Sequence, residues 1–312
     1  MTVRDVNYTC DDFFHHKPWP MPVDVMERGV VKLCQNEVEG GLEGKPFFAT
    51  LFSTTDRIPV YTANAIVLHR GAKSYDRPSS EYWKRVALGL CGRNALPVNS
   101  VDSIITFTNH TELKMCRKYQ AVCEDYHDNE LDLDRGHLSP NAINSQNLEK
   151  QRATFTLTNA APQFAKFNQH SWRVYECVTM YTILDLVPGE KVYILTGTYG
   201  TALDKNNKPL WLNKNELPDK NPVKVPGYYW KAVCYPGNSH NAAWGYAIVQ
   251  KNVNVKEMAD FRNYMTLKIF ADKYFLDLPF GSECLNASFG QFGKHVFPTW
   301  NKFIDSHCSD DY

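Results

Sequence analysis

The chain has 312 residues and a mass of 35.8 kDa, which allows one large domain or two smaller ones. Hydrophobic residues make up 43% and charged residues 22%, a balance that excludes a wholly disordered chain. The 34 basic residues equal the 34 acidic ones in number, so a uniformly basic nucleic-acid coat is also excluded. A basic patch is still allowed, because residues 70–118 carry a local excess of Lys and Arg. No apolar run reaches the roughly 18 to 20 residues of a membrane-spanning helix, so the sequence predicts no membrane span.

Nine cysteines and three N-glycosylation sequons favour a secreted or luminal location. The sequons begin at Asn7, Asn109 and Asn286. Cysteines near the two ends of the chain predict the terminal disulfides Cys10–Cys34 and Cys284–Cys308. The odd number of cysteines leaves at least one thiol unpaired, and we expect it to be Cys91.

Residues 1–45 predict an irregular N-terminal extension, because the prolines within 15–23 break helices. Strands are predicted where β-branched and aromatic residues gather, over 46–52, 58–68, 192–200, 228–235 and 243–250. Helices are predicted over 79–90, 168–184 and 258–276. This mixed order of strands and helices predicts an α+β domain.

The segment from Asp134 to Asn141 reads DRGHLSPN and places an acid, a guanidinium and an imidazole within four residues. If this segment is extended, Arg135 and His137 share one face. A neighbouring cation tends to keep the imidazole neutral, as a general base facing an anionic substrate requires. The alternative is a surface turn in which Asp134 pairs with Arg135.

A second group of polar residues follows about 20 residues later. Asn159 and Gln163 precede a predicted helix on which Asn168, Trp172 and Glu176 are spaced four apart. Asn168 and Glu176 would lie roughly 12 Å apart along the helix axis, so both cannot bind one ion directly. Mg²⁺ suits such a pair because it takes oxygen ligands and keeps several waters, with Mn²⁺ as a substitute. The alternative is a plain amphipathic helix with Asn168 as its cap.

Taken in order, DRGH, N-x-x-PQ and FN-x-x-x-W-x-x-x-E resemble the DNA/RNA non-specific endonucleases, a ββα-metal group. The resemblance covers residues 46–281 and implies a mostly antiparallel central sheet flanked by helices. Residues 1–45 and 282–312 lie outside it, and the latter form a cysteine-containing C-terminal extension. The cysteines and sequons are most similar to the animal secreted branch of endonuclease-domain proteins.

The resemblance also implies a role for each matching residue. His137 corresponds to the general base, and Asn168 corresponds to the direct protein ligand of Mg²⁺. Glu176 would hold a metal-bound water and Arg135 would contact the phosphate. Asp134, which opens the motif, is expected to support the catalytic residues, and so are Asn159 and Gln163. Arg57 is expected to supply a further cation to the phosphate.

The implied activity is hydrolysis of DNA and RNA to products with 5′-phosphate ends. The sequence contains no base-reading motif, so contacts with the phosphate backbone would dominate binding. Three alternatives remain open: a catalytically weak relative that binds nucleic acid or another polyanion, an extracellular interaction protein acting through its terminal segments, and a different phosphoesterase.

Overall fold

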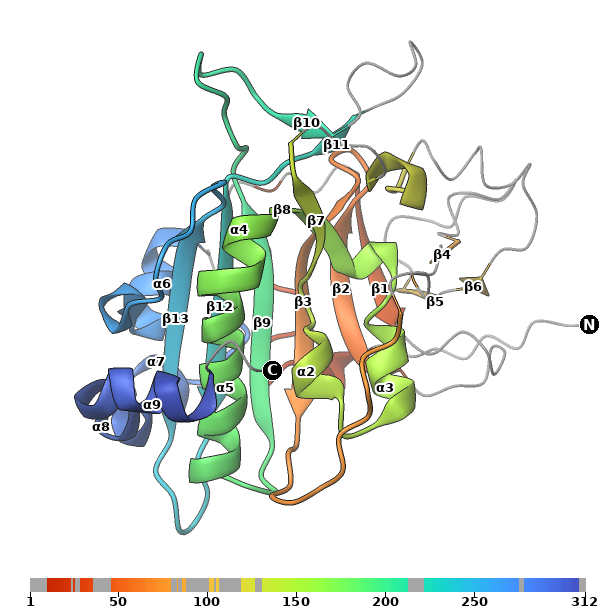
Figure 1. The fold of residues 1–312 in the computed structure, drawn as a ribbon. Coiled ribbons are helices and arrows are strands. Elements are labelled where there is room, and N and C mark those ends of the chain that lie inside the picture. Colours follow the sequence, from red (N-terminus) through yellow and green to blue (C-terminus); the bar gives the residue numbers. More distant parts are fainter. Residues whose placement is uncertain are drawn as a thin grey trace, which may run out of the picture.

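Eight strands form one central sheet in the order β14-β13-β12-β9-β3-β2-β1-β5 (Figure 1). The computed structural model describes residues 10–23, 25, 29–35, 46–79, 83, 86–87, 101–103, 105–106, 119–126, 131–212, 222–274 and 278–308. The strands of the sheet are β1 (Val30–Gln35), β2 (Phe48–Ser53), β3 (Ile58–Ile66), β5 (Val101–Ser103), β9 (Val192–Tyr199), β12 (Tyr228–Tyr235), β13 (Trp244–Lys251) and β14 (Tyr264–Met265). All neighbours are antiparallel except β1 and β5, which run parallel.

Six further strands form three small two-stranded sheets, β4 with β6, β7 with β8 and β10 with β11. Their bounds are β4 (Val86–Ala87), β6 (Ile105–Thr106), β7 (Leu133–His137), β8 (Ala160–Phe164), β10 (Trp211–Leu212) and β11 (Val223–Lys224). The helices are α2 (Asn141–Asn144), α3 (Leu148–Ala153), α4 (Ala165–Phe167), α5 (Arg173–Leu186), α6 (Leu267–Tyr274), α7 (Ser282–Leu285), α8 (Gly290–Val296) and α9 (Trp300–His307).

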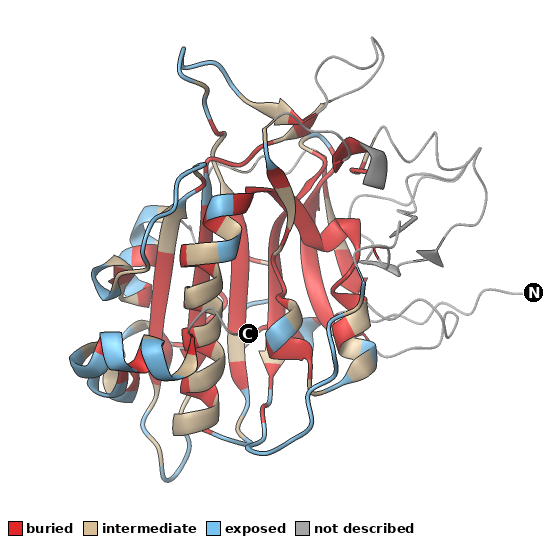
Figure 2. Ribbon diagram, in the orientation of Figure 1, coloured by how far each residue is buried: buried red, intermediate tan, exposed pale blue. Residues whose placement is uncertain are grey.

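The sheet is buried on both faces, as the red strands in Figure 2 show. Alternation along β12 explains this, because successive side chains of a strand point to opposite faces. Tyr229 and Val233 join the cluster beneath α5, whereas Trp230 and Ala232 join the cluster that contains α6. In Figure 1, α2, α3, α4 and α5 cover one face of the sheet. The structure therefore confirms the predicted α+β class, with a largely antiparallel sheet flanked by helices.

Strands β7 and β8 pair antiparallel and lead directly into a helix, which gives the ββα arrangement that the sequence predicts. The helix begins at Ala165, continues through a π-helical turn, Asn168–Trp172, and ends at Leu186. Asn168 is therefore an internal residue and not the helix cap, because the chain turns helical three residues earlier.

Two predicted helices differ from the structure. Of the segment 79–90, the described residues include Val86–Ala87, which form strand β4. The helix predicted over 258–276 begins only at Leu267, because Tyr264–Met265 pair with β13. Asp260 precedes them and its carboxylate accepts a hydrogen bond from Arg262 N, which caps a separate 3₁₀ turn.

The terminal segments pack onto the same body as the sheet. Residues 1–45, expected to be irregular, contain β1, whose six residues pair with β2. In the C-terminal segment, α8 and α9 join the cluster beneath α5 through Phe292 and Phe303. Among the described residues, no helix combines the length and apolar character that crossing a bilayer requires.

The structure confirms the disulfide Cys10–Cys34, whereas the predicted Cys284–Cys308 bond is wrong. Cys284 pairs with Cys234 on β12, and Cys308 pairs with Cys177 on α5. Cys284 belongs to the apolar cluster on one face of the sheet and Cys308 to the cluster on the other face, so the two cannot meet. Cys91 lies outside the described residues.

Candidate functional site

Strand β7 carries the DRGH motif in the extended conformation that its proposed chemistry requires. Its partner β8 supplies Gln163 opposite Asp134 and Ala160 opposite His137. Gly136 lies between, where an added Cβ would overlap the Gln163 side chain and approach Tyr229 Oη to 2.9 Å. Glycine at this position therefore permits the close contact between β7 and the strands beneath it.

Arg135 and His137 share one face of β7, and the Trp83 ring lies against both. The ring centroids of Trp83 and His137 are 4.6 Å apart, and the Arg135 guanidinium carbon lies 5.2 Å from the Trp83 centroid. Phe155 also contacts the imidazole, at 4.8 Å between centroids, and lies 5.3 Å from the Trp83 ring. These rings fix the plane of His137 and exclude water from part of its surface.

Burial, together with the positive charges of Arg77 and Arg135, lowers the pKa of His137 to about 3. The imidazole is therefore neutral at physiological pH. Its buried Nε2 atom has no hydrogen-bond partner within the described part of the protein. A neutral imidazole with an unpaired ring nitrogen in a cavity is competent to accept a proton.

Asn159 holds the loop that follows His137. Its Oδ1 accepts a hydrogen bond from Ser139 N at 2.9 Å, and its Nδ2 donates to Ser139 O at 3.0 Å and Thr154 O at 2.7 Å. The side chain is fully buried. Asn159 thus holds both the N–H and the C=O of Ser139, two residues beyond His137.

The π-helical turn and α5 present Asn168 and Glu176 to the same cavity as His137. Asn168 Nδ2 donates to Asp134 Oδ2 at 2.8 Å, and Gln169 Nε2 donates to the same oxygen at 3.0 Å. The first contact joins the two sequence motifs directly. Because the amide nitrogen faces Asp134, its Oδ1 faces away and can serve as a ligand.

Glu176 lies close enough to the buried Lys231 to feel its charge. Burial raises the pKa of Glu176 to about 7, while the charges of Lys231 and Arg77 act in the opposite direction. Lys231 is 1% exposed, donates from Nζ to Thr196 Oγ1 at 3.0 Å, and lies 5.6 Å from the Trp172 ring centroid. The lysine ammonium thus favours the ionised form of a carboxylate that burial would otherwise neutralise.

These side chains surround one cavity of about 330 Å³, within the size range of small-molecule sites. Its polar lining residues are Arg77, His137, Asn141, Asn168, Arg173 and Glu176. Cys177, Met180, Tyr181, His307 and Cys308 also line it. The site therefore combines a base, two guanidinium groups, two amides and a carboxylate with an apolar wall.

The donor set fits a water-rich Mg²⁺ site. Asn168 Oδ1 and the Glu176 carboxylate are oxygen donors, and Asn141 Oδ1 is buried without a hydrogen-bond partner among the described residues. No group of three His, Cys, Asp or Glu side chains able to hold an ion occurs in the part of the chain that the structure covers. This composition suits a hard cation that keeps most of its waters, rather than Zn²⁺.

Of the sequence-predicted site residues, His137, Asn168 and Glu176 line the cavity, whereas Asp134, Arg135, Asn159, Gln163 and Arg57 do not. The last two of these are buried. The Arg57 guanidinium donates to Asp125 Oδ2 at 2.7 Å and to the Gln120 carbonyl oxygen, and the side chain is 1% exposed. It is a buried structural ion pair, so the expected contact of Arg57 with the phosphate has no support here. Gln163 is fully buried next to Gly136, and its amide atoms have no hydrogen-bond partner among the described residues.

Sequence reasoning missed Arg77, Arg173 and Lys231. Arg77 was one charge among many in the basic stretch 70–118, and only the tertiary fold brings it to His137. One local signal was present, because Pro78 favours an extended backbone at Arg77. Arg173 lies one helical turn before Glu176 on the same face of α5, which helical spacing could have indicated.

Comparisons with known proteins identify the family of the chain. The family model described as "DNA/RNA non-specific endonuclease" matches residues 32–270. The human "Endonuclease domain-containing 1 protein" is 32% identical over 231 residues, covering 72% of this chain and 38% of its own length. The mouse protein of that name is 28% identical, covering 86% of this chain and 47% of its own length. The chain thus spans less than half of these relatives.

Two more distant proteins complete the comparison. A protein named "Nuclease" from Nostoc sp. is 32% identical over 100 residues, which cover 32% of this chain and 31% of that protein. A solved structure of the EndoG/EndoGI complex covers 78% of this chain and 88% of its own, with a TM-score of 0.49 and 15% identity. On the family match over most of its length, the chain belongs to the DNA/RNA non-specific endonuclease family.

Proposed function

We propose that this protein is a Mg²⁺-dependent endonuclease that hydrolyses phosphodiester bonds of both DNA and RNA and leaves 5′-phosphate ends. One observation carries the proposal: neutral His137, with its ring Nε2 unpaired, lines the same cavity as Asn168, Glu176 and Arg77. A base, a cation site and a guanidinium are the groups that phosphodiester hydrolysis requires.

In this mechanism His137 Nε2 accepts a proton from the water that attacks phosphorus. The Arg77 and Arg135 guanidinium groups neutralise charge that develops on the non-bridging oxygens. Trp83 and Phe155 hold the imidazole in place throughout. Asn168 and Glu176 would hold Mg²⁺, directly and through water respectively. When bound, that ion supplies Lewis-acid stabilisation of the phosphate and the leaving oxygen.

Both nucleic acids are expected substrates, because the site offers groups that recognise phosphate. Arg77 and Arg173 line the cavity, and Arg135 lies on β7 two residues before His137. These cations would pair with phosphate oxygens that DNA and RNA share. Mn²⁺ should replace Mg²⁺, since it also prefers oxygen ligands.

We also propose that the protein is secreted or lies in the lumen of an organelle. Three disulfides among the described residues support an oxidising compartment. Asn286 and Ser288 of the third sequon are exposed at the end of α7, as attachment of an oligosaccharide requires. The sequons at Asn7 and Asn109 lie outside the described residues.

Nicking of supercoiled plasmid and digestion of a matched single-stranded RNA test the proposal. Both substrates should be cut in Mg²⁺ or Mn²⁺ and be left intact in EDTA, and the new 5′ ends should accept ligation without prior phosphorylation. Binding of either nucleic acid without cleavage in any divalent metal would instead favour a catalytically inactive binding protein.

A further inference from the structure

The lining of the cavity combines polar and apolar side chains, and α5 contributes both kinds. Glu176 belongs to the polar lining, and Met180 follows it one helical turn later on the same face. The two residues are about 6 Å apart along the helix axis, which is the scale of one nucleotide. A phosphate bound beside Glu176 would therefore place its attached sugar and base near Met180.

Two aromatic rings, those of Tyr181 and His307, form a wall of this cavity. Tyr181 lies 4.8 Å from His307 between ring centroids, and His307 stacks on Phe303 at 4.6 Å with an interplanar angle of 26°. Tyr181 and His307 are both partly accessible, whereas Phe303 is buried beneath His307. Planar rings with an accessible face are the groups on which nucleobases stack.

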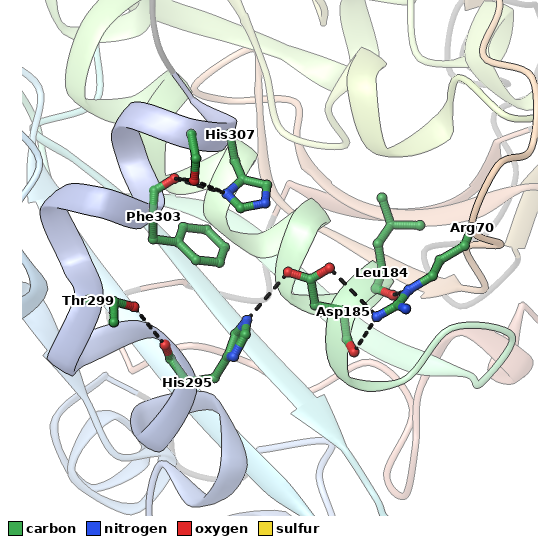
Figure 3. Close-up of polar contacts among 8 residues, drawn as sticks. Arg70, Leu184, Asp185, His295, Thr299, Phe303 and His307 are labelled. Carbon is green, nitrogen blue, oxygen red and sulfur yellow. Dashed lines mark hydrogen bonds and ion pairs between the residues drawn. The ribbon is translucent and has the colours of Figure 1, made fainter.

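The wall is held rigidly by bonds from α5 to the C-terminal segment. The Cys177–Cys308 disulfide joins the residue after Glu176 to the residue after His307, and Arg173 Nη2 donates to Cys308 O at 3.3 Å. The His307 ring is itself oriented, because its Nδ1 lies 3.1 Å from Phe303 O (Figure 3). A preorganised wall of this kind loses little conformational entropy when a ligand binds.

A second contact secures the same helices farther along α5. His295 Nε2 on α8 lies 3.4 Å from Asp185 Oδ2, and Arg70 Nη2 donates to the Asp185 carbonyl from the other side (Figure 3). The C-terminal segment is therefore held against α5 at two places, near Cys177 and at Asp185.

We propose that Met180, Tyr181 and His307 form a subsite for an unstacked nucleobase next to the scissile phosphate. The proposal rests on the function inferred above and adds a substrate class, the unpaired strand. A base inside a duplex is stacked on both sides and must leave the helix to enter a cavity, which costs a few kcal/mol, whereas a base in a single strand need not. The chain therefore selects single-stranded DNA and RNA over duplex.

The test is direct binding in EDTA, where no hydrolysis occurs. A fluorescent oligothymidylate and an abasic oligonucleotide of equal length carry the same phosphates and differ only in their bases. Stacking on this wall should make the oligothymidylate bind roughly 5- to 150-fold more tightly. That ratio should fall towards one in Tyr181→Ala and in His307→Ala, and should be largely retained in Tyr181→Phe.

Tyr228→Ala is the matched control, because Tyr228 is an exposed tyrosine on β12 that does not line this cavity. It should keep the wild-type ratio, and melting temperatures verify that each variant folds. A wild-type ratio near one, or an unchanged ratio in both alanine variants, would overturn the subsite. Failure of the nuclease proposal is a separate outcome, since it appears as absent cleavage in Mg²⁺ with the binding ratio intact.

Discussion

The side-chain amide of Asn168 donates to Asp134 Oδ2 across 2.8 Å and joins two motifs that lie 34 residues apart in the chain. The contact fixes which atom of the amide is the donor, so Oδ1 faces away from Asp134. Asp134 therefore has a defined task that its place in the motif did not reveal. It orients the residue proposed to bind the cation.

If Asn168 binds Mg²⁺ directly and Glu176 binds it through water, alanine substitutions of the two residues should lower the cleavage rate by different factors. Loss of a group that acts through bound water costs about 10- to 100-fold, so Glu176→Ala should fall in that range. Asn168→Ala should lose more, because the direct ligand itself is removed. Cleavage rates measured across a Mg²⁺ titration will show this order, and undiminished cleavage by Asn168→Ala at limiting Mg²⁺ would refute the one-ligand site.

The two arginines Arg57 and Arg77 should behave in opposite ways. Arg57→Ala removes the guanidinium that pairs with the buried carboxylate of Asp125, and breaking such an ion pair costs about 3 to 5 kcal/mol of folding free energy. Arg77→Ala removes an exposed side chain that faces His137, so it should lower kcat/KM and leave the melting temperature near that of the wild type. Thermal unfolding combined with cleavage kinetics separates them. A stable, inactive Arg57→Ala variant would contradict this assignment.

Sequence patterns predicted the elements that depend on local chemistry. The strands at β2, β3, β9, β12 and β13 follow from runs of β-branched and aromatic residues, and DRGH occupies a strand as expected. Local sequence patterns could not predict which distant residues meet in the folded protein. The position of Arg77 beside His137, the buried partner of Arg57 and the pairing of Tyr264 with β13 all depend on distant parts of the chain.

Disulfide pairing illustrates the same limit and gives a further prediction. Which cysteines meet depends on which face of the sheet each segment covers, and spacing along the chain carries no such information. Peptide mapping of unreduced protein should recover Cys177 linked to Cys308 and Cys234 linked to Cys284. Recovery of a Cys284–Cys308 peptide would show that the C-terminal segment is placed differently.

His137 and Glu176 should give opposite pH dependence of stability in EDTA. The folded pKa of His137 is depressed to about 3, below its unfolded value, so the unfolded chain binds the extra proton and stability falls as pH drops below about 6.5. The folded pKa of Glu176 is raised to about 7, so its contribution grows as pH drops from there towards its unfolded value. In the wild type the two trends offset one another.

Two variants separate these trends. Between about pH 7 and pH 5, His137→Gln should gain stability relative to the wild type by about 1 to 2 kcal/mol, because only the Glu176 trend remains. Glu176→Gln should lose a similar amount over the same interval. Urea unfolding at each pH measures both changes, and parallel curves for the two variants would contradict the assigned environments.

The central claim is that His137 is the base of a metal-dependent nuclease. The most direct measurement compares the Mg²⁺-dependent cleavage rate of wild-type protein with that of His137→Ala on DNA and on RNA, alongside the melting temperature of each. A positioned general base contributes about 10² to 10⁴-fold, so the account predicts a loss in that range on both substrates with the fold retained. Turnover by a folded His137→Ala variant within a few-fold of wild type would contradict it.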